Sequence, residues 1–179
     1  MTISIKPTAS GSTIEQDGST ILTVDGSGNI TPSNDLYPKV PAFSAYMGSD
    51  LSLTSGVYTK VPIDTEDFDT TSDFDTSTYR FTPSVEGYYQ INGTVRGIGT
   101  SRTTFLLAFY KNGSSHKVVS LNREASSSSA VISASAVIYM NGSTDYLELY
   151  GFMLFSSGGS LDYAAYKDSC FFSGHLVSV

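Results

Sequence analysis

Basic residues are scarce in this 179-residue sequence. Lysine and arginine total 10 against 17 acidic residues, which gives a formal net charge of −7. The ten basic residues form no cluster along the chain. Binding to a nucleic-acid backbone requires a concentrated basic surface. We therefore expect no nucleic acid among the partners.

Cysteine and long apolar runs are equally scarce. Cys170 is the only cysteine, which excludes an intrachain disulfide and a zinc site built from cysteines. It precedes Phe171 and Phe172 and is expected to pack in the core. No run of 18 apolar residues occurs, so no membrane insertion is expected. The opening MTISIKPTAS also lacks the basic and apolar regions of a secretory signal.

Catalytic motifs are absent as well. The sequence has no Gly-x-Ser-x-Gly elbow, no phosphate-binding loop and no His-Glu-x-x-His. Its two histidines, His116 and His175, belong to no recognisable Ser-His-Asp arrangement. We predict that the protein is not an enzyme and needs no cofactor.

One acidic segment, PIDTEDFDTTSDFD at 62–75, invites comparison with a calcium site. Carboxylate oxygens are the ligands that Ca²⁺ prefers, but the segment has no glycine at a sharp turn and no fixed ligand spacing. A solvated acidic loop is the favoured interpretation, and folding is expected to need no metal. The calcium candidates are Asp64, Asp67, Asp69, Asp73 and Asp75.

Most of the remaining sequence has the pattern of short strands. Apolar and polar residues alternate, and Asn112-Gly113, Asn141-Gly142 and Ser157-Gly158-Gly159 are turn signals. Asn92-Gly93 is also interpreted as turn chemistry. The pattern predicts an all-β jelly-roll sandwich without a helix. The expected strands are 41–47, 56–62, 78–82, 86–98, 103–111, 115–121, 130–140, 144–155 and 170–178.

Two of these strands, 103–111 and 144–155, are apolar on both faces. One face of a sandwich strand fills the core, and the other is wet in a monomer. A second, tyrosine-rich face therefore predicts subunit contact. The alternative is that a loop of the same chain covers it. The predicted subunit-contact residues are Leu106, Tyr110, Tyr146, Tyr150 and Phe152.

Residues 1–36 contain no aromatic residue and differ from the head at 37–179. Asp-Gly pairs at 17–18 and 25–26 favour tight turns around a short strand. We expect an extended β-arm that a partner orders, with a floppy tail as the alternative. Its predicted attachment residues are Ile14, Ile21, Leu22, Val24 and Ile30.

The head resembles the globular head of the complement and tumour necrosis factor superfamily. The signature of that family places a Phe and then Gly-x-Tyr at set spacings, and Phe74, Phe81, Gly87 and Tyr89 hold such positions here. Asp69 also fits, whereas Ile63, Ile91 and Gly93 replace aromatic residues of the signature. The resemblance implies a ten-stranded jelly roll that assembles as a tight homotrimer.

The arm has a resemblance of its own. ILTVDGSGNITPSND, residues 21–35, is similar to segments of bacteriophage tail fibres and other virion proteins. Together the two resemblances imply a virion protein, a trimeric decoration or cement protein that binds the major capsid protein, stabilises the outer shell and helps contact the host. One alternative is the receptor-binding tip of a tail fibre or tailspike, with tyrosines on host surface glycan. A further alternative is a secreted complement-like or tumour necrosis factor-like binding module, against which the missing secretory signal argues. An arm of about 36 residues favours anchoring on a shell over a long fibre shaft.

Overall fold

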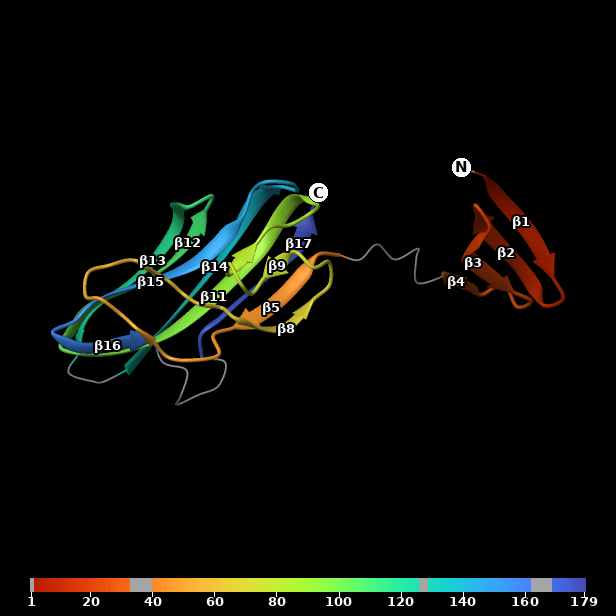
Figure 1. The fold of residues 1–179 in the computed structure, drawn as a ribbon. Helices are drawn as coiled ribbons and strands as arrows, with labels where there is room; N and C mark the ends of the chain where they lie inside the picture. Colours follow the sequence, from red (N-terminus) through yellow and green to blue (C-terminus); the bar gives the residue numbers. More distant parts are fainter. Residues whose placement is uncertain (1, 33–39, 126–128, 162–168) are drawn as a thin grey trace. The chain divides into compact units, whose positions relative to one another are not determined.

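A computed structural model describes residues 2–32, 40–125, 129–161 and 169–179, all of whose regular elements are β-strands (Figure 1). The chain divides into two units, Met1–Lys39 and Val40–Val179. The boundary expected between residues 36 and 37 lies outside the described residues. Among the described residues there is no helix long and apolar enough to cross a membrane. The predicted all-β class is confirmed.

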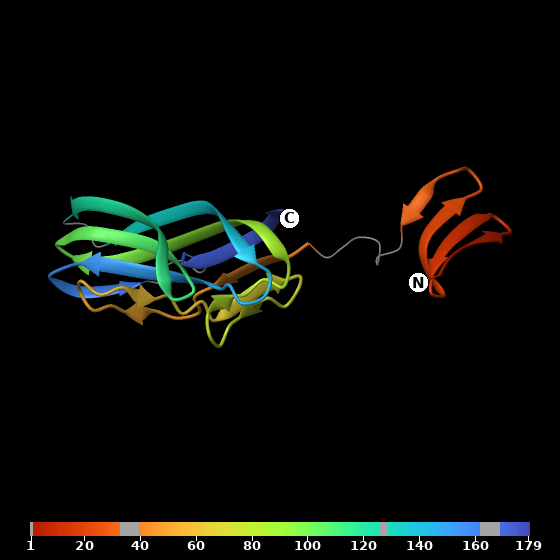
Figure 2. The ribbon, with the colours of Figure 1, turned by 90° about the horizontal axis from the view of Figure 1, so that it is seen from above.

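The head, Val40–Val179, is a sandwich of two antiparallel sheets whose strands run along its long direction (Figures 1 and 2). The β12/β15 sheet has the order β13 (Ser114–Ala125), β12 (Arg102–Lys111), β15 (Leu147–Leu154), β10 (Arg80–Phe81), β9 (Phe74–Asp75), and β7 (Thr59–Lys60) also pairs with β15. The β11/β14 sheet has the order β6 (Leu51–Ser52), β16 (Ser157–Leu161), β11 (Glu86–Thr100), β17 (Phe171–Ser178), β5 (Ala42–Tyr46), β8 (Thr65–Asp69), and β14 (Ser129–Asn141) pairs with β11.

The core between these sheets is built from alternate residues of each strand. Tyr89, Ile91 and Val95 of β11 point inward and are fully buried, whereas Tyr88 is exposed. Phe43 stacks on Phe81 with ring centroids 4.2 Å apart. Burial of this aromatic and aliphatic set is the main stabilising term of the head.

The residues of the family signature lie in this core. Phe81 meets the Tyr89 ring edge to face at 5.4 Å, and the Tyr89 hydroxyl donates a 2.7 Å hydrogen bond to the Val85 carbonyl. A side chain at Gly87 would place its Cβ only 2.4 Å from the Ser178 carbonyl oxygen. Phe74 packs on Phe43 with ring centroids 5.0 Å apart. Phe81, Gly87 and Tyr89 thus fix the position at which β11 enters the sandwich.

Replacing Tyr89 with Phe is expected to lower the free energy of unfolding by about 1 kcal/mol, because the half-buried Val85 carbonyl loses its donor. Burial, with a smaller contribution from Asp73, raises the pKa of Tyr89 to about 12. The unfolded tyrosine ionises near pH 10, so the wild type loses stability as the pH rises from there to about 12. Urea titrations at pH 7 and pH 11 check both effects. If the Phe variant loses as much stability between pH 7 and pH 11 as the wild type, that loss comes from other tyrosines.

Three local predictions from sequence are wrong in detail. The acidic segment is partly β8 and β9 instead of a loop, and β8 forms one edge of its sheet by pairing with β5. Asn92-Gly93 lies inside β11, where a Cβ at Gly93 would come within 2.7 Å of Leu149 Cδ1. Close packing, and not a turn, therefore explains this glycine. Ser157-Gly158-Gly159 begins β16.

The N-terminal unit is folded more extensively than the expected arm. It forms one antiparallel sheet in the order β1 (Ile3–Thr8), β2 (Gly11–Gln16), β3 (Ser19–Asp25), β4 (Ile30–Pro32). Asp17 and Gly18, with φ of 49° and 88°, make the tight turn between β2 and β3. The Asp25 carboxylate accepts hydrogen bonds from the Ser27 and Asn29 backbone amides and shapes the next turn.

Candidate interaction surfaces

An aromatic cluster covers the outer face of the β12/β15 sheet. Tyr110 and Tyr150 stack with ring centroids 3.9 Å apart, and Phe152 packs against Tyr58 at 4.8 Å. Tyr58 precedes β7, which pairs with β15, so a segment of the same chain covers part of this face. Leu106 lies directly opposite Phe152. The structure thus brings together four of the five residues predicted for subunit contact, all of them half-buried.

The fifth, Tyr146, belongs to a charged group at the same face. Glu148 is only 2% exposed and pairs with Lys60 at 2.7 Å and with Arg80 at 2.8 Å. The Arg80 guanidinium lies 4.1 Å from the centre of the Tyr146 ring. Its hydrogen bond to Glu148 raises the pKa of Arg80. Both cations contact the same oxygen, Glu148 Oε1, so this buried carboxylate is paired with opposite charge.

Replacing Glu148 with Gln is expected to lower the free energy of unfolding by about 1–3 kcal/mol, because two charge-assisted contacts to a buried acceptor are lost. Urea denaturation measures the change. Glu86→Gln is the matched control, since Glu86 is exposed and its carboxylate accepts the Tyr139 hydroxyl; its effect is expected to stay within about 0.5 kcal/mol. Equal losses in the two variants would contradict a special role for the buried pair.

The outer face of the β11/β14 sheet is more exposed, and several of its apolar side chains are gathered at one end. Tyr88, Val137, Tyr139 and Val177 gather at one end and are 51%, 52%, 41% and 57% exposed. Tyr88 and Tyr139 are directly opposite in register, and their rings meet at 5.5 Å. An exposed apolar group of this kind marks an interaction surface.

The centre of the same face is a shallow depression. It is lined by small side chains of β11, β14 and β17, among them Asn92, Thr94, Ser133 and Ser135. Thr94 and Ser133 share a 2.8 Å hydrogen bond, and Ser135 donates to Asn92 at 3.0 Å. The hydroxyls are therefore already engaged with one another, and the apolar end is the stronger candidate for contact.

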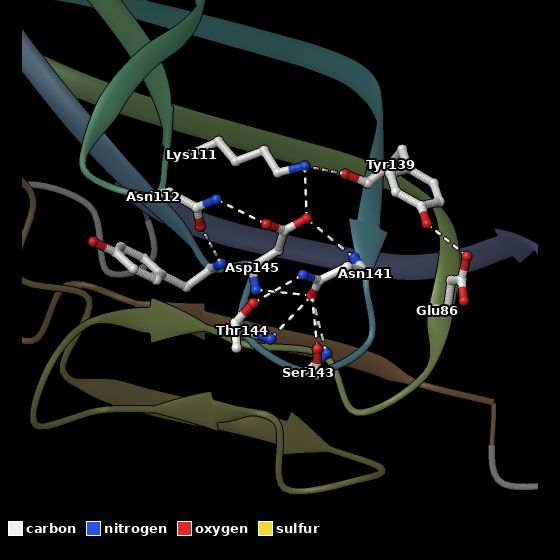
Figure 3. Close-up of polar contacts among 9 residues, drawn as sticks. Glu86, Lys111, Asn112, Tyr139, Asn141, Ser143, Thr144 and Asp145 are labelled. Carbon is white, nitrogen blue, oxygen red and sulfur yellow. Dashed lines mark hydrogen bonds and ion pairs between the residues drawn. The ribbon is translucent and has the colours of Figure 1, made fainter.

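A polar network fixes the loop that joins β14 of one sheet to β15 of the other (Figure 3). The Asp145 carboxylate accepts from Asn112 Nδ2 at 2.7 Å and pairs with Lys111 at 2.8 Å. These two contacts, the Asn112 bond first, hold the pKa of Asp145 below its usual value. The Asn141 Oδ1 accepts backbone amides from the loop, and Tyr139 donates to Glu86 at 2.6 Å. The network holds Tyr139 at the apolar end of the β11/β14 face.

All five predicted calcium candidates accept hydrogen bonds from the protein, and those of Asp69 and Asp75 form turns. Asp69 accepts the amides of Thr71, Ser72 and Phe74, and Asp75 accepts those of Ser77 and Thr78. Further bonds engage the other three: Asp64 with Gly48, Asp67 with Ser44, and Asp73 with Ser84. In the described parts of the chain, no group of three His, Cys, Asp or Glu side chains is arranged to hold a metal ion.

Four of the five predicted attachment residues share one face of the N-terminal sheet. Ile14 is directly opposite Leu22, and Val24 is opposite Ile30. Ile21 lies at the irregularity between β2 and β3. The sequence interpretation missed Ile3 and Ile5, which are exposed on β1; their alternation with polar residues was the available signal.

Solved structures with the same fold come from the complement and tumour necrosis factor groups. The globular domain of zebrafish complement 1qA protein is 20% identical, with a TM-score of 0.57 over 77% of this chain and 97% of that one. Murine APRIL at pH 5.0 is 10% identical, with a TM-score of 0.59 over 78% and 100%. Eiger TNF from S. frugiperda is 10% identical, with a TM-score of 0.51 over 78% and 92%.

Among curated proteins, no match to the chain is found. The C1q domain family matches residues 42–177, a range that includes the described strands of the head except the last residue of β17. The range also contains the buried Phe74, Phe81 and Tyr89 and the close approach at Gly87. By this match and by its jelly-roll architecture, the chain belongs to the C1q domain family.

Proposed function

We propose that this protein is a homotrimeric C1q-type decoration protein of a bacteriophage capsid, attached through its N-terminal unit. The observation that carries the proposal is the contrast between its two units. The head encloses a complete core, whereas the N-terminal unit is a single sheet with exposed isoleucines. The head can therefore fold by itself, whereas the N-terminal unit needs a partner for stability. The phage setting is supported by the resemblance of residues 21–35 to virion proteins.

The trimer is supported by the family and by an uncovered surface on the head. The sequence places subunit contact on the β12/β15 face, but those aromatics are half-buried and partly covered by the Tyr58 segment. The apolar end of the β11/β14 face has more area to bury. We place the subunit contact there, because an exposed group of two tyrosines and two valines gains most from exclusion of water.

Attachment by the N-terminal unit would gain strength from the trimer. Three units act together, so a weak individual contact becomes a stable one. The outer strands β1 and β4 also have unpaired backbone groups along one side, which suit addition to a neighbouring sheet. The head then faces outward, where Tyr58, which is 37% exposed on the β12/β15 face, contacts host glycan, and the head has no enzymatic role.

A second candidate is supported by the comparisons. The related folds include a complement globular domain and proteins of the tumour necrosis factor type, so a binding module that acts outside a virion fits the head equally well. A tail-fibre tip would use the same trimer and the same N-terminal unit at a different place in the particle.

The location of the chain in particles tests these alternatives. We expect antibody labelling or cryo-electron microscopy to find trimers spread over the capsid of a phage that encodes this chain. Label confined to the tail would favour the fibre-tip function. Absence from the particle would overturn the virion proposal and favour the free binding module.

A further inference from the structure

The N-terminal sheet has one apolar and one polar face. Residues directly opposite each other in an antiparallel sheet lie on the same side. One such row joins Ile5, Ile14, Leu22 and Pro32 across all the strands. A second row joins Pro7, Ser12, Val24 and Ile30, and Ile3 lies on the same side as Ile5.

The other face carries the polar side chains. Its central row joins Lys6, Thr13, Thr23 and Thr31. Lys6 also forms an ion pair with Glu15 on this face. The charges of the strands are thus gathered on one side or at the turns, and the apolar face carries none.

Nothing in the described part of this unit covers the apolar face. The unit is a single layer, and Ile5 and Ile30, on its two outer strands, are 70% and 64% exposed. A sheet needs a second layer against its apolar face to be stable. With roughly 60–120 Å² for each large apolar side chain, the face offers on the order of 500 Å². That area matches the largest patches that whole monomers leave exposed, and those patches are often functional.

Other copies of the same face are the best occupants. An uncharged apolar surface is complementary to itself and needs no oppositely charged partner. A trimeric head would also hold three copies close together, because the seven residues at 33–39 extend at most about 25 Å. Short tethers of this kind give effective concentrations in the millimolar range.

We propose that the three N-terminal sheets of a trimer pack their apolar faces against one another and form a second, separate three-fold core. This inference rests on the proposed trimer of the head. It reassigns the predicted attachment residues Ile14, Leu22, Val24 and Ile30 to the inside of that core. The outer strands β1 and β4 are then the parts of the unit that meet the shell.

Two neighbouring residues on β3 provide a matched test in the full-length chain. Leu22 is on the apolar face and Thr23 on the polar face. Leu22→Cys is expected to cross-link between chains with a short bis-maleimide, whereas Thr23→Cys is not. Cys170 is the only native cysteine and is buried, so the wild type serves as the background control. Native mass spectrometry of the untreated variants reports the trimer separately.

The outcomes separate this inference from the proposed function. Monomers before treatment would overturn the trimer and the inference with it. Trimers without cross-linking at Leu22, or with equal cross-linking at both positions, would overturn the three-fold core alone. A second variant needs no cysteine: Ile5→Asp is expected to keep the trimer mass but to speed amide hydrogen exchange in β2 and β3 by about tenfold or more. Unchanged exchange in that variant would also contradict the three-fold core.

Discussion

A Val137→Asp variant is expected to be a folded monomer, because the substitution would dissociate the proposed homotrimer. Val137 is 52% exposed beside Tyr139 on the β11/β14 face, so the folded subunit tolerates a charge there. In the trimer, the same carboxylate would be buried without a partner, which costs about 3–5 kcal/mol at each contact. Sedimentation velocity at micromolar concentration measures the result.

Val118→Asp is the matched control for this prediction. Val118 is 46% exposed on β13, in the other sheet, and the variant is expected to remain a trimer. Phe152→Asp tests the subunit contact that the sequence predicts on the β12/β15 face. If Phe152→Asp dissociates the trimer and Val137→Asp does not, the contact lies on the aromatic cluster instead. A wild-type monomer would remove the trimer from the proposal altogether.

Deletion of residues 1–39 is expected to abolish attachment to capsids while the head stays folded and trimeric. The head retains its whole core because every buried core residue belongs to Val40–Val179. What is lost is the four-stranded N-terminal sheet, which lies outside that core. Co-sedimentation with capsids purified from a phage that lacks the gene measures attachment. At a protein concentration that saturates capsids with the full chain, we compare binding of the truncated head. Its affinity for capsids is expected to be lower by at least about 100-fold, the scale on which multivalent contacts act.

Thr23→Asp in the full-length chain is the control for the deletion. It adds a charge to the polar face of the N-terminal sheet and is expected to leave capsid binding within about twofold. A truncated head that binds capsids as well as the full chain would show that the head carries the attachment surface. If the full chain binds only to phage tails, the N-terminal unit attaches the head at a fibre tip instead of on the capsid.

Long alternating strands were predicted from sequence to within a few residues. The pattern around Tyr89, Ile91 and Val95 indicates which side faces the core, and the structure buries those three residues. When one face of a strand is buried, apolar and polar residues alternate along that strand, so the signal lies within its own sequence. The short strands β8 and β9 have no such signal. Their pairing depends on β5 and β10, which lie elsewhere in the sequence.

The candidate surfaces were only partly predictable for the same reason. The pattern of 144–155 shows that Tyr150 and Phe152 face away from the core, but it does not show that Tyr58 packs over them. Nor does it show that Val137 and Tyr139 are left open on the other sheet. Exposure depends on which distant segment crosses a face. The turn at Asp17-Gly18 was predictable because a tight turn is local, whereas the two-faced N-terminal sheet depends on all four strands.

The acidic residues of β8 have a consequence for heads that stand close together on a surface. β8 is the last strand of its sheet, and it carries Glu66, Asp67 and Asp69. A neighbouring head that tried to extend the sheet there would bring its own like-charged strand alongside. Such repulsion between outermost strands discourages chains from merging into continuous β-structure. Heads that are densely crowded on a surface would therefore not join through β8, and each would remain free to bind a target.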